Sequence, residues 1–93
     1  MPAIQLTLLS KPGCHLCDDA RAAVTEVIAT FETGRPEASI ALEEKSILDD
    51  QALFDEYVEE IPVVLINGRV HTVWRVDRDR LTTALTTELE ESA

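Results

Sequence analysis

The sequence predicts an α/β domain whose elements follow the order βαβαββα and build a four-stranded mixed sheet flanked by helices. Three observations lead to this prediction. A strand-like run at residues 3–9 precedes a long amphipathic helix, an apolar run fills residues 61–66, and Asn67-Gly68 follows that run directly. A strand–helix–strand unit requires a right-handed crossover with parallel pairing, whereas Asn-Gly between strands favours an antiparallel hairpin. Both kinds of pairing therefore belong to one sheet.

The first strand and the first helix have clear periodicities. Ile4, Leu6 and Leu8 alternate with polar residues, and Leu9 adds an apolar side chain to the second face, as in a central strand covered on both sides. A helix of about 18 residues follows and ends at Gly34. The apolar residues that recur in it at helical spacing, and are expected to form its buried stripe, are Leu16, Ala20, Val24, Val27, Ile28 and Phe31.

The middle of the chain has weaker patterns. Ile40 and Leu42 alternate over residues 39–45, which predicts a second strand. Asp49 or Asp50 then provides the N-cap of a short helix. The apolar residues of this helix are Leu53, Phe54, Tyr57 and Val58.

The apolar run at residues 63–66 suits a buried strand, and Pro62 stands at its start because proline cannot donate to a strand ladder. After the turn, we expect a returning edge strand with Val70, Thr72 and Trp74 on one face and with Arg69, His71, Val73 and Arg75 on the other.

Asp77 is predicted to cap the last helix. Its expected buried stripe is Leu81, Ala84, Leu85 and Leu89, and its exposed side is Thr83, Thr87 and Glu91.

Composition and charge limit the function classes. The chain has 93 residues, 45% of them hydrophobic and 28% charged, which is typical of a single globular domain spanning residues 1–93. Its formal net charge is −10. This charge repels nucleic acid and anionic membrane surfaces at long range, so neither is expected as a partner.

The N-terminus, MPAIQLTLLSK, lacks the basic segment, the apolar run and the cleavage site of a secretory signal, and no stretch is apolar enough to span a membrane. We therefore expect a cytoplasmic protein. In a reducing compartment two cysteines rarely form a permanent structural disulfide, and a bridge across so short a loop restricts the unfolded chain little. The cysteine pair is then explained by reactivity, metal binding or chance.

Both cysteines, Cys14 and Cys17, lie in the segment KPGCHLCDD, where the first strand ends and the long helix begins. Unpaired N–H groups and the positive end of the helix dipole stabilise a thiolate at Cys14. Thiols of CxxC motifs at helix N-termini have pKa values of about 3.5 to 7.5, against about 8.5 for a free thiol. Cys17 lies nearly one turn deeper, within reach of a mixed disulfide on Cys14. We therefore predict that Cys14 attacks and that Cys17 resolves.

Charged neighbours are candidates for a supporting role. His15, as an imidazolium, would favour the Cys14 thiolate, and as a neutral ring would accept a proton; a solvent-facing histidine is the alternative. Lys11 would supply positive charge if its side chain folds back over the thiol. Asp18 and Asp19 stabilise the helix start, while their charge opposes a nearby thiolate.

Metal and haem sites within one chain are not predicted. Structural zinc takes four ligands, and this chain offers only the CxxC pair, His71 and His15, of which His15 lies too near the cysteines in the sequence to chelate with them comfortably. Asp18 occupies the position where haem attachment requires histidine, and a second cysteine pair for an iron–sulfur cluster is absent. We therefore expect a monomer without a bound cofactor. An iron–sulfur cluster shared between two chains remains an alternative.

Three segments, SKPGCHLCD, YVEEIPVVLINGRV and WRVDRDRL, resemble a small bacterial glutaredoxin-like protein of the thioredoxin superfamily, and the resemblance covers nearly the whole chain. It implies a thioredoxin-like fold in which the bond before Pro62 is cis and Pro62 faces the thiols. It also implies that the Ile61 main chain pairs with a substrate as an added strand does. Ile61 and Pro62 are therefore substrate-binding candidates.

The chain departs from both parent families. The CPYC-type site of glutaredoxins is CHLC here, and their double-glycine segment, which with a following aspartate holds the glutathione carboxylate, has no counterpart in WRVDRD. Lys11 does fall where glutaredoxins carry a basic glutathione contact. Thioredoxins carry a buried acid six positions before the first cysteine, and that place is Leu8 here.

Together these features predict a thiol–disulfide oxidoreductase that reduces disulfides or mixed disulfides of a protein or a small-molecule thiol. Glutathione and thioredoxin reductase are the candidate electron donors. Two alternatives stay open: a non-catalytic redox-sensing or protein-binding module on the same scaffold, and an interchain iron–sulfur or metal carrier.

Overall fold

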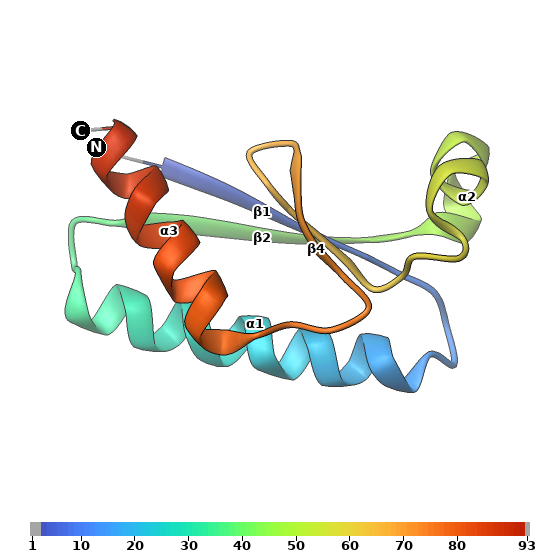
Figure 1. Ribbon diagram of the computed structural model, residues 1–93, viewed down its shortest axis with the longest axis horizontal. Helices are drawn as coiled ribbons and strands as arrows, with labels where there is room; N and C mark the ends of the chain where they lie inside the picture. The colour runs from blue at the N-terminus through green and yellow to red at the C-terminus, as the bar shows by residue number, and fades with distance from the viewer. Residues whose placement is uncertain (1–2, 93) are drawn as a thin grey trace.

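The computed structural model describes residues 3–92 and has the predicted order of elements (Figure 1). The elements are β1 (Ala3–Ser10), α1 (His15–Gly34), β2 (Ser39–Ser46), the 3-10 helix η1 (Ile47–Asp49), α2 (Gln51–Tyr57), β3 (Val63–Ile66), β4 (Arg69–Val73) and α3 (Arg78–Ser92). Of the two candidate caps of the short helix, Asp50 is the N-cap of α2. The turn η1 was not predicted.

The four strands form one mixed sheet in the order β2-β1-β3-β4. β1 pairs in parallel with β2, whereas β1 with β3 and β3 with β4 pair antiparallel. The predicted mixed sheet is therefore confirmed. β1 lies inside the sheet, which explains why nearly all its side chains from Ile4 to Ser10 are buried.

The two faces of the sheet carry separate hydrophobic clusters. On one face, Leu6 and Leu8 of β1 pack with the buried stripe of α1 and with Leu81 and Leu85 of α3. On the other face, Leu9 packs with Ile47, and α2 covers this second cluster. Figure 1 shows α1 running along the strands and α2 standing at the end of the sheet where β1 passes into α1.

The Asn67-Gly68 turn forms as predicted. Both residues have positive φ, 50° and 84°, the combination that a tight hairpin of this kind requires. The side chain of Asn67 also ties the turn to the sheet, because its Oδ1 accepts from the Gln5 N–H at 2.9 Å. Asp77 caps α3 as expected, since its Oδ1 accepts from the Arg80 N–H at 3.0 Å.

The predicted alternation of the last strand is wrong beyond its middle. Val64 pairs with Thr72 while Leu65 pairs with Val70, so His71 is an extra residue at a bulge. β4 then ends at Val73, and Trp74 leaves the strand with a φ of 66°.

Leu16 was predicted to be buried and is 47% exposed. It lies on the apolar side of α1, but in the first helical turn, where neither core cluster extends over it. Leu42 is also partly exposed because β2 is an edge strand. No helix within residues 3–92 has both the length and the apolarity needed to cross a membrane.

Replacing Leu85 with Ala should lower the free energy of unfolding by about 2 to 5 kcal/mol, because its fully buried side chain leaves a cavity between α3 and the sheet. Urea denaturation measures the change. As a control, Leu48→Ala removes a side chain that is 59% exposed and should change stability by less than about 0.5 kcal/mol. Equal losses in both variants would contradict the assigned core.

Candidate functional site

The loop between β1 and α1 places Cys14 at the helix N-terminus. Gly13 has a φ of 76°, which turns the chain from the strand towards the helix. Cys14 is the N-cap residue of α1, and its Sγ accepts a hydrogen bond from the Cys17 N–H at 3.1 Å. A sulfur atom thus occupies the place where a capping oxygen usually binds the first free amides of a helix.

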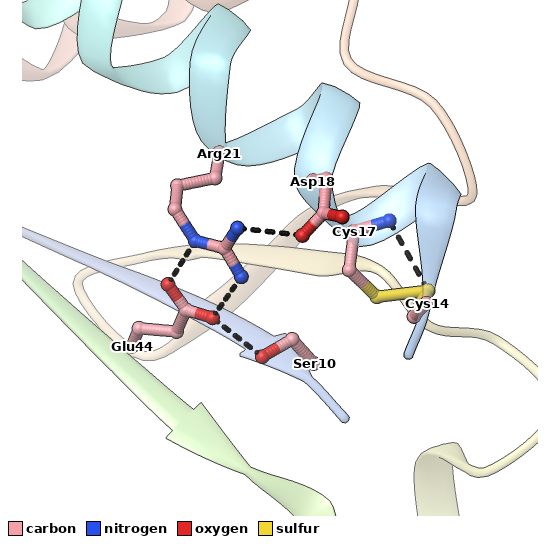
Figure 2. Close-up of a disulfide and its surroundings, with 6 residues drawn as sticks. All are labelled: Ser10, Cys14, Cys17, Asp18, Arg21 and Glu44. Carbon is pink, nitrogen blue, oxygen red and sulfur yellow. Dashed lines mark hydrogen bonds and ion pairs between the residues drawn. A yellow bond between two sulfur atoms is a disulfide. The ribbon is translucent and has the colours of Figure 1, made fainter. Parts of the chain in front are cut away.

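Cys14 and Cys17 are joined by a disulfide, with Cα atoms 5.2 Å apart (Figure 2). The Cys17 side chain is fully buried, whereas Cys14 is partly exposed. In the oxidised pair only the Cys14 sulfur is therefore open to a molecule from solution, in the arrangement expected when the first thiol attacks and the second resolves.

The surroundings of the pair are apolar on the side of the sheet. Cys17 belongs to the cluster formed by Leu9, Ile47, Ile61 and Val63, and Cys14 packs against it. The Ile61–Pro62 peptide bond is cis, and both residues are buried. The structure thus brings Ile61 into the cluster that holds both sulfurs, with Pro62 directly after it.

Aromatic residues of α2 complete this cluster. Phe54 and Tyr57 pack against it from the short helix. Burial raises the pKa of the Tyr57 hydroxyl above its ordinary value, and the charges of Glu56 and Glu60 act in the same direction. This hydroxyl therefore stays protonated around neutral pH.

The two predicted supporting side chains lie at the surface. His15 and Lys11 are both exposed. Within residues 3–92, neither side chain forms an ion pair or donates a hydrogen bond to a cysteine sulfur. Both residues are close to Cys14 in the sequence, but these contacts do not support a role for either side chain in the site.

A polar network beside the disulfide was not predicted (Figure 2). Arg21 donates from Nη1 to Asp18 Oδ1 at 2.8 Å, and from Nε and Nη2 to the two carboxylate oxygens of Glu44 at 2.6 and 2.5 Å. Ser10 Oγ donates to Glu44 Oε2 at 2.7 Å. These hydrogen bonds hold the pKa of the Glu44 carboxyl below its ordinary value and that of the Arg21 guanidinium above it.

Part of this network had a signal in the sequence. Asp18 and Arg21 are three residues apart on one helix, a spacing at which opposite charges meet. Glu44 had no such signal, because its approach to Arg21 depends on the parallel register that sets Leu8 opposite Glu44.

A hollow of about 450 Å³ opens on the other side of the helix start, and Leu16 and Trp74 both line it. Trp74 is fixed by hydrogen bonds from its backbone N–H to the Pro62 carbonyl at 2.8 Å and from its indole Nε1 to the Glu59 carbonyl at 3.0 Å. Its ring nevertheless stays largely in solvent, with 57% of the residue exposed. Arg75 and Val76 line the same hollow.

The exposure of Trp74 and Leu16 was missed because their periodicity matched that of a strand face and a helix stripe. The positive φ of Trp74 turns its side chain away from the strand face. Leu16 is exposed because neither core cluster extends over its position in the first turn of α1. Over the described part of the chain, no three His, Cys, Asp or Glu side chains converge in the manner of a metal site.

Comparisons with known proteins agree with this geometry. The family model of the glutaredoxin-like domain (DUF836) matches residues 5–86. An uncharacterised protein of Mycobacterium tuberculosis is 31% identical over 83% of this chain and 77% of its own length. A glutaredoxin-like protein of Dictyostelium discoideum is 26% identical over 96% of this chain and 82% of its own.

Solved structures show the same fold. A structural-genomics target protein of X. campestris has 32% identity and a TM-score of 0.68, over 88% of this chain and 96% of that one. The oxidised thioredoxin of Plasmodium falciparum has 11% identity and a TM-score of 0.59, over 97% and 82% of the two chains, which shows the fold alone. By its matched residues the chain belongs to the glutaredoxin-like domain family (DUF836), and its fold is that of the thioredoxins.

Proposed function

We propose that the protein is a thiol–disulfide oxidoreductase that reduces disulfides through the Cys14–Cys17 pair. The observation that carries this proposal is the position of Cys14, which caps the first helix, is partly exposed, and is bonded to the buried Cys17. A thiolate formed at Cys14 would accept the Cys17 N–H hydrogen bond and lie at the positive end of the helix dipole.

The reaction begins with the reduced dithiol. The Cys14 thiolate attacks one sulfur of the substrate disulfide; this bond breaks, and one substrate thiolate leaves. A mixed disulfide joins Cys14 to the other substrate sulfur. Cys17 then attacks the Cys14 sulfur and forms the Cys14–Cys17 disulfide, while the second substrate sulfur leaves and takes up the proton of the Cys17 thiol. Two electrons pass from the dithiol to the substrate.

An external thiol reductant has to restore the dithiol. Glutathione and thioredoxin reductase are the two candidate donors, and a reducing compartment such as the cytoplasm supplies both kinds of electron source. Lys11 would supply positive charge to glutathione, whereas Trp74, Arg75 and Val76 occupy the segment in which glutaredoxins bind it. We therefore favour a reductase or another dithiol protein as the donor.

The substrate we favour is a protein disulfide. The hollow lined by Leu16 and Trp74 includes the residue directly before Cys17, and it would offer apolar side chains to residues that flank a substrate cysteine. The Ile61 main chain, next to Pro62, would pair with the same segment as an added strand. Small-molecule disulfides, which have no flanking residues, would use neither contact.

Cys14→Ser should lower the turnover of insulin disulfides by roughly three orders of magnitude or more, because the attacking sulfur is lost. Cys17→Ser should instead accumulate a mixed disulfide on Cys14, which mass spectrometry of the intact protein detects. Consumption of reduced nicotinamide nucleotide is followed in two assays, one with glutathione and its reductase and one with thioredoxin reductase, so the active assay identifies the donor.

Turnover that survives Cys14→Ser would overturn the assignment of the nucleophile. Reversible formation of the Cys14–Cys17 disulfide without turnover in either assay would support the redox-sensing alternative over the enzyme.

Trp74→Ala should lower kcat/KM for insulin by about tenfold while leaving kcat/KM for hydroxyethyl disulfide unchanged, since the ring contacts only substrates with flanking side chains. Leu16→Ala should act in the same direction without disturbing the hydrogen bonds of Trp74. Val70→Ala, which truncates another exposed apolar residue, is the control. An equal loss on both substrates in the Trp74 variant would argue against a binding role.

A further inference from the structure

We propose that Arg21 is a positioning residue that sets the reactivity of the Cys14–Cys17 pair by binding two carboxylates at the start of α1 and fastening this helix end to the sheet. The inference rests on the proposed function in one respect only, namely that the Cys14 thiolate is the reacting species. The main test of this inference is a pH titration of the Cys14 thiol, which does not depend on turnover of a substrate.

The charges around Cys14 explain why such a residue is needed. Asp18 lies one turn into the helix, and its backbone N–H donates to the Cys14 carbonyl at 3.1 Å. Asp18 lines a hollow on this side of the helix together with Glu44 of β2 and Asp49 of η1. Carboxylates in this position oppose the formation of a thiolate on Cys14.

The remaining titratable groups near Cys14 do not balance these carboxylates through fixed contacts. Lys11 and His15 are exposed and have no ion pair within residues 3–92. Tyr57, which packs in the same cluster as Cys14 from the side of α2, is neutral at pH 7, since the ordinary tyrosine pKa is about 10 and burial raises it further. Arg21 is therefore the cation with defined contacts at this helix end.

The guanidinium makes three hydrogen bonds to the two carboxylates. Two of them form a fork on Glu44, and the third reaches Asp18 (Figure 2). Arginine suits this task because its planar donors bind one carboxylate at two points and still present another N–H to a second. One positive charge thus offsets part of the charge of both acids.

The same contacts join three elements. Ser10, the last residue of β1, donates to Glu44 of β2, and Glu44 accepts from Arg21 of α1. The network therefore ties the helix start to the end of the sheet from which the Cys14 loop departs. The Cys17 N–H that donates to Cys14 Sγ belongs to the same helix start, directly before Asp18.

A role in stability alone is a poor explanation for these contacts. The side chains of Arg21 and Asp18 are 41% and 64% exposed, and exposed ion pairs contribute little to folding. A nearby positive charge, by contrast, favours the ionised form of a thiol, and we expect Arg21 to change the thiol–thiolate ratio by a factor of roughly two to five. The measurable effect should therefore appear in the chemistry of Cys14.

The test compares Arg21→Gln with the wild type in the reduced state. The ultraviolet absorbance of the thiolate, followed against pH, should titrate at a higher pH in the variant. The rate of Cys14 alkylation by iodoacetamide at a pH below the midpoint should fall by roughly two- to fivefold, while the rate well above the midpoint should stay the same. Urea denaturation verifies that the variant remains folded under the assay conditions.

Two further variants separate charge from structure. Adding Asp18→Asn to Arg21→Gln should return the titration most of the way to the wild-type midpoint, because the opposing carboxylate is then neutral. Arg21→Lys keeps the charge and loses the fork, so a midpoint between those of the wild type and Arg21→Gln is expected.

Arg69→Gln is the matched control. It breaks the ion pair of Arg69 with Glu88 at the hairpin, the end of the sheet opposite to Ser10, and removes the same charge from the chain. Its titration should coincide with that of the wild type.

An unchanged midpoint in Arg21→Gln would overturn the proposal, as would an equal shift in Arg69→Gln or a double variant that titrates like Arg21→Gln alone. If the wild-type protein turns over no disulfide, the proposed function fails, whereas a shifted titration still supports the role of Arg21.

Discussion

The hydrogen bond from the Cys17 N–H to Cys14 Sγ, at the first turn of α1, is the interaction on which the site depends. It exists because β1 ends at Ser10 and a short loop then delivers Cys14 to the N-cap position. Any residue at an N-cap lies beside unpaired backbone N–H groups. A cysteine sulfur at this position can become an anion, which these N–H groups and the helix dipole stabilise. We therefore expect the geometry of the helix start to determine how readily the Cys14 thiol loses its proton.

The two hydrophobic clusters differ in whether they contain the cysteines. The cluster between the sheet and helices α1 and α3 contains neither cysteine and holds the scaffold together. The smaller cluster under α2 includes Cys17, and Cys14 packs on it. The site is therefore built on the part of the core that the short helix α2 covers, while the long helix α1 supplies the charged end of its dipole.

Polar contacts then distinguish the two sides of the helix start. On one side Arg21 gathers Asp18 and Glu44 against the end of the sheet. On the other side the exposed side chains of Leu16 and Trp74 line one hollow. In a chain with a formal charge of −10, this arrangement places the ion-paired Arg21 side chain on one flank and exposed apolar side chains on the other.

Local patterns in the sequence determined most of the secondary structure and the place of the thiols. Alternating residues gave β1, helical spacing gave α1, and the φ preferences of Asn67 and Gly68 gave the hairpin, because each depends on neighbours in the chain. The CxxC pair between a strand and a helix was visible for the same reason.

Tertiary structure alone decided which apolar residues stay exposed and which charges meet. Leu16 has the spacing of a buried residue, yet its side of the first turn of α1 lies outside both core clusters and it is 47% exposed. Glu44 meets Arg21 only because the parallel register brings the end of β2 beside the helix, and Trp74 points outward because a bulge and a positive φ end β4. These contacts join residues far apart in the chain, so periodicity, which describes only near neighbours, does not contain them.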